Sequence, residues 1–204
     1  MGWAEERGLH LVLDEVYALS VYGDTPFVSG ASLRPSLGDR VHLCWAFSKD
    51  FGVSGLRCGV LVTENEALMR SVDALAYWAA VSGDTQHVLG AMVSDTPWVE
   101  GYVAAMRNRL RDSYTAVTTA LDAAGIPFVP AEGGHFLLCD LRPWLATPTW
   151  EAEDALWGHL LERANVKLTP GSSCRNAEPG FMRLCFATEP KEAVAGAVGR
   201  MAAP

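Results

Sequence analysis

The sequence predicts an α/β fold, with a mostly parallel β-sheet covered by helices in residues 1–95 and a smaller α+β domain in residues 96–204. In the first part, short runs that are apolar on both faces alternate with helical segments, as in the central strands of a covered parallel sheet. After Gly125 the pattern changes to strand-like runs around one amphipathic helix, which favours a second layer of α+β type.

Three apolar runs are the predicted strands of the first domain. They are LHLVL at residues 9–13, VHLCWAF at 41–47 and CGVLV at 58–62. Three strands alone would leave large apolar surfaces bare. We therefore expect either extensive dimerisation or a chain that is the C-terminal part of a longer protein.

The helices predicted between the third strand and Gly125 begin at polar residues of helix-start type. Thr63 and Glu66 have the spacing of a capping box, which predicts a helix over about residues 64–81. A second helix is expected after Asp84. A long helix should follow over about residues 95–124.

The second domain is predicted to contain four strands and two helices. The strands are IPFVP at residues 126–130, HFLLCDL at 135–141, VKLTPG at 166–171 and FMRLCFA at 181–187. An amphipathic helix is expected over residues 149–163. Thr188 should cap a last helix, with Pro190 in its first turn.

Composition narrows the function classes. The net charge is −8, and the basic residues are not clustered, which argues against nucleic acid or an anionic membrane as the main partner. The sequence contains no run of about 18 apolar residues, so no membrane span is expected. Its first residues do not have the pattern of a signal peptide. The cysteines number five, an odd count without a CxxC pair, so we expect a cytoplasmic protein with neither a disulfide framework nor a zinc site.

Lys49 ends the apolar run WAFSK and is one of only three lysines in the chain. At the end of a buried strand its ammonium would be partly desolvated, which favours a nucleophilic amine able to form a Schiff base with an aldehyde. Ser48 and Arg57 could hold a phosphate nearby, and Gly55 would let the backbone come close to it. The alternative is that Lys49 begins a solvated turn.

Two further segments contain polar side chains at or within apolar strands. Asp14 ends the first strand, where a pyridinium nitrogen would be a suitable partner for its carboxylate, and Tyr17 could donate to a phenolic oxygen of the same ring. Asp14 could instead be a turn or cap residue, and Tyr17 an aromatic at the edge of the core. Arg183 interrupts the apolar run FMRLCFA and would bind either a substrate carboxylate or an acidic side chain of the protein.

An aldehyde, a pyridine nitrogen, a phenolic oxygen and a phosphate together describe pyridoxal 5'-phosphate. The segments HLVLDEVY, SKDFGVSGLRCG and TPGSSCRNAEPGFMRLCFA resemble motifs of the fold type I pyridoxal-phosphate enzymes, the class I/II aminotransferase family. Within that family the last segment is most similar to 1-aminocyclopropane-1-carboxylate synthases and synthase-like proteins. The resemblance implies the C-terminal part of an aspartate-aminotransferase-like large domain, followed by the small domain, without the N-terminal half.

The resemblance also implies a role for each candidate residue. Lys49 would form the Schiff base and move the α-proton, and Arg183 would bind the substrate α-carboxylate. Cofactor contacts would come from Asp14 at the pyridinium, Tyr17 at the ring oxygen, and Ser48 and Arg57 at the phosphate. Ala46 stands where the family usually has serine, which implies one phosphate contact fewer.

The implied substrate is S-adenosylmethionine or a related α-amino acid, and the implied assembly is a homodimer. An aminotransferase is the alternative reaction, because the lysine motif and both arginines serve either chemistry. A catalytically silent relative that acts only through its dimer surface is the alternative of another class.

Overall fold

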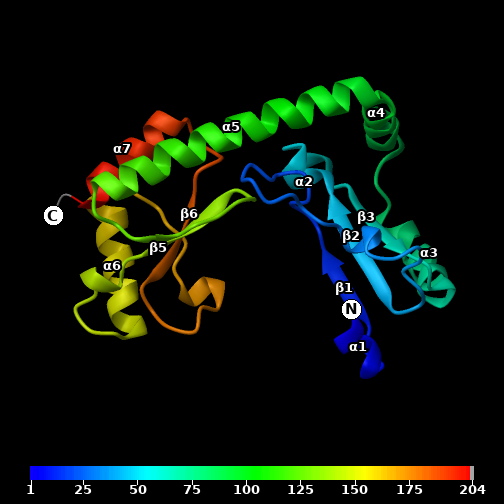
Figure 1. The fold of residues 1–204 in the computed structure, drawn as a ribbon, viewed down its shortest axis with the longest axis horizontal. Coiled ribbons are helices and arrows are strands. Elements are labelled where there is room, and N and C mark those ends of the chain that lie inside the picture. Colours follow the sequence, from blue (N-terminus) through cyan, green and yellow to red (C-terminus); the bar gives the residue numbers. More distant parts are fainter. Residues whose placement is uncertain (203–204) are drawn as a thin grey trace. The chain divides into compact units, whose positions relative to one another are not determined.

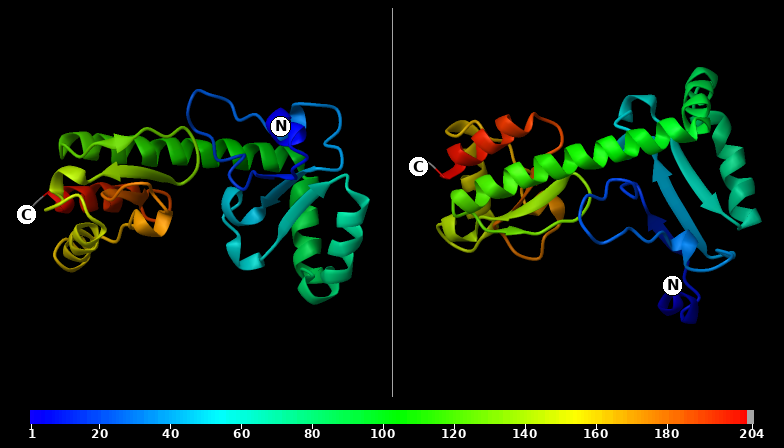
Figure 2. Two further views of the ribbon diagram at one scale, coloured as in Figure 1. Left: turned by 90° about the horizontal axis from the view of Figure 1, so that it is seen from below. Right: turned by 45° about the horizontal axis from the view of Figure 1, so that its top comes forward.

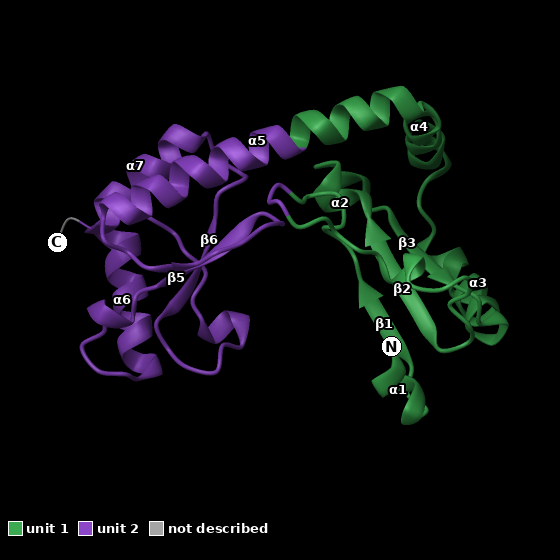
Figure 3. Ribbon diagram, in the orientation of Figure 1, with its two compact units in different colours: residues 1–21, 25–106 green, residues 22–24, 107–204 purple. Residues whose placement is uncertain are grey.

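The computed structural model describes residues 1–202, which form two compact units (Figure 3). Within the described residues, the first unit consists of residues 1–21 and 25–106, and the second of residues 22–24 and 107–202. Helix α5 (Thr96–Ala123) begins in the first unit and ends in the second. The division therefore falls inside one continuous helix, at residue 106, and differs from the boundary at residue 95 that the sequence predicts.

The first unit contains a three-stranded sheet in the order β1-β2-β3, whose strands lie side by side (Figures 1 and 2). The strands are β1 (Leu11–Asp14), β2 (Val41–Ala46) and β3 (Gly59–Thr63). Each largely coincides with a predicted run. β1 and β2 are parallel, whereas β2 and β3 are antiparallel.

Four α-helices lie wholly within the described part of the first unit. They are α1 (Gly2–Glu6), α2 (Phe47–Asp50), α3 (Glu66–Ala79) and α4 (Gly83–Ser94). The predicted capping box of α3 is wrong. The Asn65 side chain caps the helix by accepting from the Leu68 amide at 2.8 Å. The Thr63 hydroxyl instead accepts from the Asn65 amide and hydrogen-bonds to His42 at 2.7 Å.

The core of the first unit is an aromatic cluster around α2. Phe47, Phe51 and Leu89 are buried in it. The rings of Phe51 and Tyr102 stack with their centroids 5.1 Å apart. Other apolar side chains of the sheet are exposed, namely Val12 at 61%, Val60 at 40% and Val62 at 43%. The described helices thus cover the sheet only in part, and the bare apolar surface that the sequence predicts is present.

The second unit has an antiparallel sheet, β4-β5-β6, with helices α5, α6 and α7 (Figure 1). Its elements besides α5 are β4 (Phe128–Val129), β5 (Phe136–Asp140), α6 (Trp150–Glu162), β6 (Phe181–Cys185) and α7 (Lys191–Ala202). The predicted strand at residues 166–171 is reduced to one bridge between Thr169 and Arg183. The predicted cap at Thr188 is wrong, because α7 begins at Lys191 and the Thr188 hydroxyl points back to the Cys185 sulfur at 3.7 Å.

The core of the second unit is formed by apolar side chains from α5, β6 and the residue that follows β6. Val117 and Leu121 of α5, Met182 of β6 and Phe186 have no exposed surface. Each such side chain contributes about 2 kcal/mol of transfer free energy. Among residues 1–202, no helix combines the length and the apolar character that crossing a bilayer requires.

Candidate active site

One edge of the first sheet gathers five of the six candidate residues. Asp14 is the last residue of β1 and is in register with Cys44 of the parallel strand β2. Ser48 and Lys49 follow the end of β2. β3 is antiparallel, with Gly59 opposite Ala46, so the segment before β3 reaches the same edge. Ligands of open α/β sheets bind at the carboxyl ends of strands, and this edge is therefore the candidate site.

Lys49 lies in α2, a helix of one turn that follows β2 directly. Ser48 is half-buried and Lys49 is exposed. The expectation of a partly desolvated ammonium at the end of a buried strand is wrong, because the helical turn directs Lys49 away from the aromatic core. Within residues 1–202 the amine has neither a hydrogen bond nor an ion pair. It is open to a ligand.

Arg57 follows a short 3₁₀ turn, η2 (Ser54–Leu56), and is exposed. Its φ of 51° is in the left-handed region, and its guanidinium donates to the Ser54 carbonyl at 3.1 Å. A β-carbon placed on Gly55 would meet no atom within 4 Å. The loop thus has free space beside the arginine, and no neighbour in this structure requires glycine at position 55.

Asp14 and Tyr17 lie at the start of the connection that leaves β1. Asp14 is exposed, and its Oδ1 accepts from the Val16 amide at 3.1 Å, as a turn residue would. Tyr17 is half-buried in the turn. The turn bond uses one carboxylate oxygen of Asp14, and the other remains available to a ligand.

Arg183 belongs to the second unit and occupies the middle of β6. It is half-buried; Nη2 donates to the Thr169 hydroxyl at 3.4 Å, and Nε is buried without a hydrogen-bond partner. The alternative of an internal salt bridge is not supported, because no acidic side chain of residues 1–202 pairs with Arg183. A cavity of about 440 Å³ adjoins the guanidinium, with Phe136, Cys174 and Asn176 among its lining residues.

Among residues 1–202, three carboxylates that the sequence analysis did not single out are buried, namely Glu15, Asp50 and Glu153. Asp50 is 1% exposed and accepts three hydrogen bonds at the end of α2. The signal that could have found it is its place between Phe47 and Phe51 in an apolar turn. Glu153 is fully buried in α6, where a first-turn glutamate is usually read as a solvated residue.

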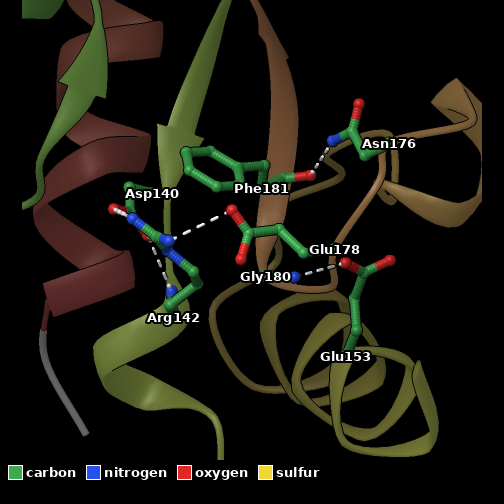
Figure 4. A network of polar contacts seen from close by, with 7 residues as sticks. All are labelled: Asp140, Arg142, Glu153, Asn176, Glu178, Gly180 and Phe181. Carbon is green, nitrogen blue, oxygen red and sulfur yellow. Dashed lines mark hydrogen bonds and ion pairs between the residues drawn. The ribbon is translucent and has the colours of Figure 1, made fainter. Parts of the chain in front are cut away.

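Glu153 fixes the segment that leads into β6. Its carboxylate accepts from the Ser172 amide at 3.0 Å. It also accepts from the Gly180 amide at 2.6 Å (Figure 4). The Asn176 side chain donates to the Phe181 carbonyl at 3.0 Å. The loop beside the Arg183 cavity is thereby tied to α6 and to the strand that carries the arginine.

A family model described as "Aminotransferase class I and II" matches residues 2–201. The chain belongs to this family. Among curated proteins, it is 39% identical over 190 residues to 1-aminocyclopropane-1-carboxylate synthase 6 of Oryza sativa subsp. japonica, covering 91% of this chain and 35% of that protein. It is 35% identical over 188 residues to a probable aminotransferase of Arabidopsis thaliana, covering 90% and 38%. The chain spans less than half the length of these relatives.

Solved aminotransferase structures have the same fold. An aromatic aminotransferase from Pyrococcus horikoshii superposes with a TM-score of 0.87 at 25% identity, covering 98% of this chain and 52% of that one. The α-aminoadipate aminotransferase LysN from Thermus thermophilus, solved with N-(5'-phosphopyridoxyl)-L-leucine, superposes with a TM-score of 0.81 at 25% identity, covering 98% and 51%. The predicted fold class, part of an aspartate-aminotransferase-like large domain followed by a small α+β domain, is confirmed.

Proposed function

We propose that this chain supplies the lysine-bearing part of a pyridoxal-phosphate-dependent enzyme that acts on an α-amino acid. The observation that carries the proposal is the edge where β1, β2 and β3 bring Asp14, Lys49 and Arg57 to one end of a sheet. Membership of the aminotransferase class I and II family supports it, as does the phosphopyridoxyl compound with which one structural neighbour was solved.

The side chains at this edge fit the cofactor by their chemistry. Asp14 offers a free carboxylate oxygen for a protonated pyridine nitrogen, and Tyr17 a phenol for the ring oxygen. Ser48 and Arg57 would hold the phosphate, and the space beside Gly55 leaves room for it. The side chain of Ala46, which precedes α2, is a methyl group and cannot add a hydrogen bond to the phosphate. When bound, the cofactor acts as the electron sink that makes an α-proton acidic.

Lys49 and Arg183 would act on the substrate. The Lys49 amine, unpaired among residues 1–202, is available to hold the cofactor and then to move the proton at Cα. Arg183 would hold the α-carboxylate through a bidentate pair, which its buried, unsatisfied Nε supports. The substrate proposed is S-adenosylmethionine or a related α-amino acid, because several curated relatives are named 1-aminocyclopropane-1-carboxylate synthases.

Amino transfer is the second candidate reaction. It is favoured by the curated relative named as a probable aminotransferase and by the solved aminotransferases. The lysine and the two arginines serve both reactions equally well, so only a product assay separates them.

The test begins with cofactor capture. The chain is incubated with pyridoxal 5'-phosphate, reduced with borohydride and mapped by peptide mass spectrometry. A phosphopyridoxyl group on Lys49 is expected, and it should be lost in Lys49→Arg but kept in Lys167→Arg, which changes another exposed lysine. An unlabelled Lys49 would reject the enzymatic proposal and favour a silent relative.

A labelled chain is then given one of two substrate sets. Formation of a cyclopropane amino acid and methylthioadenosine from S-adenosylmethionine would support the synthase reaction. Formation of a new amino acid from an amino acid and a 2-oxo acid would support amino transfer.

A further inference from the structure

The buried carboxylate of Asp50 follows the exposed Lys49 directly in the sequence, and it joins two segments of the candidate site. We infer that Asp50 is a positioning residue that holds the helical turn of Lys49 against the connection that carries Asp14 and Tyr17. The inference rests on the proposed function, because it concerns how Lys49 is presented to the cofactor.

The hydrogen bonds of Asp50 come from both sides of the site. Its Oδ1 accepts from the Ser20 hydroxyl at 2.6 Å, and its Oδ2 accepts from the Leu19 amide at 3.1 Å. These donors stand in the connection after β1, shortly beyond Tyr17. Oδ2 also accepts from the Trp45 indole at 2.8 Å, from β2. One side chain therefore links β1's connection, β2 and α2.

Helix α2 needs such an anchor because it is only one turn long. An isolated helix of four residues is not stable in water, and tertiary contacts must supply its stability. Its N-cap is Ala46, whose side chain makes no capping bond. Its tertiary anchors include the buried rings of Phe47 and Phe51, the carboxylate of Asp50, and a hydrogen bond from the Phe47 amide to the Cys58 carbonyl at 3.3 Å.

A carboxylate can accept from all three donors without any of them reversing its role. All three partners point an N–H or O–H group at Asp50, and a carboxylate offers only acceptors. An amide of the same shape would turn an NH₂ group toward at least one of them, and of the three only the Ser20 hydroxyl could rotate to accept from it. Asp50→Asn thus changes the bonding of the anchor with little change in volume.

Glu153 provides a matched comparison in the other unit. It is also a fully buried carboxylate, and it also accepts from backbone amides, those of Ser172 and Gly180. Glu153→Gln should lower stability as Asp50→Asn does. It should leave Lys49 unchanged, because these contacts of Glu153 lie within the second unit.

The experiment measures two properties of the 204-residue chain. The first is hydrogen exchange of the backbone amides without cofactor. Asp50→Asn should speed exchange of the Leu19 amide and of the α2 amides by about tenfold or more, because it removes a hydrogen bond to a charged group. The second is the concentration of pyridoxal 5'-phosphate that half-labels Lys49 on borohydride reduction. It should rise about tenfold in Asp50→Asn and stay at the wild-type value in Glu153→Gln.

Ser20→Ala covers the case in which Asp50→Asn does not fold. It removes one buried donor and keeps the carboxylate. We expect faster exchange of the α2 amides and a rise of about threefold in the half-labelling concentration, as for loss of one ordinary hydrogen bond.

The inference would be overturned if a folded Asp50→Asn variant, or Ser20→Ala, kept the wild-type half-labelling concentration for Lys49 and the wild-type exchange rates of the α2 amides. Equal labelling loss in Glu153→Gln would also overturn it, because the effect would then follow global stability. Failure of the wild-type chain to be labelled at all would instead reject the proposed function. The exchange of the α2 amides would still decide whether Asp50 holds that turn.

Discussion

The guanidinium carbon of Arg183 lies 4.3 Å from the centroid of the Phe136 ring, which belongs to the neighbouring strand β5. The aromatic face and the Thr169 hydroxyl are the partners that hold this side chain. Neither neutralises its charge. A half-buried arginine that is oriented by a ring and lacks an acidic partner within residues 1–202 is well suited to an anionic ligand.

Replacing Arg183 by lysine should weaken binding of an α-amino acid by about tenfold or more, because lysine keeps the charge but cannot form the bidentate fork. Isothermal titration of the cofactor-loaded chain with methionine measures this affinity. Arg109→Lys is the control, since Arg109 is an exposed arginine of α5. Equal affinity in Arg183→Lys and wild type would exclude Arg183 from the carboxylate site.

Asp14→Asn should weaken retention of pyridoxal 5'-phosphate by about tenfold or more, because the amide removes the negative charge proposed to face the pyridine nitrogen. The fold should be preserved, since the amide oxygen can still accept from the Val16 amide. Equilibrium dialysis gives the cofactor affinity, with Asp73→Asn on the exposed surface of α3 as control. A variant that retains cofactor as wild type does would leave Asp14 as a turn residue only.

The pair of Asp140 and Arg142 should make stability depend on pH. Arg142 donates from Nε at 2.9 Å and from Nη2 at 2.7 Å to the two carboxylate oxygens, and it also reaches Glu178 (Figure 4). These hydrogen bonds, with the arginine's charge, hold the pKa of Asp140 below its usual value. The stabilisation is therefore complete above the unfolded-state pKa of about 3.9 and is lost as pH falls through the lower folded-state value.

Urea unfolding at several pH values tests this linkage. Asp140→Asn should unfold at lower urea than wild type at pH 7, and the two curves should converge as the pH is lowered below about 4. Asp154→Asn, on the exposed surface of α6, should change little at any pH. A difference between Asp140→Asn and wild type that is constant with pH would show that ionisation of Asp140 does not contribute.

Much of the fold could be predicted because the strands of the first unit consist mainly of apolar residues. The direction of β3 could not, since CGVLV is equally apolar read in either direction and does not indicate that β3 pairs antiparallel with β2. The start of α3 was misplaced for a local reason. Thr63 has the spacing of a cap, but its hydroxyl is already bonded to His42, and Asn65 takes the role.

For the candidate site, the identities of the residues could be predicted from the sequence, but their burial could not. The motif around Lys49 was sufficient to predict Ser48, Lys49 and Arg57 as candidates, because their residue types and spacing carry the chemistry. Burial was not predictable from the motif. Lys49 was expected to be partly desolvated and is exposed, whereas Asp50, the next residue, is the buried member of the pair. Which face of a one-turn helix enters the core depends on the aromatic cluster that it meets.

Cys139 should be the least reactive thiol of the native chain. It is fully buried in β5, and this burial raises the pKa of its thiol to about 12. In the unfolded state the pKa of the thiol is about 8.5. Between this pH and the folded-state value, Cys139 stays protonated in the native state while the unfolded chain loses the proton. Its contribution to stability is thus complete below about pH 8.5 and declines as pH rises toward about 12.

Alkylation with iodoacetamide at pH 8, followed by peptide mapping, checks this expectation. Cys174, which is half-buried and lines the Arg183 cavity, should react in the native chain. Cys139 should react only after urea is added, because the thiolate is the nucleophile and only the unfolded state forms it at this pH. Native labelling of Cys139 at the rate of Cys174 would mean that the sheet of the second unit opens far more readily than its buried core implies.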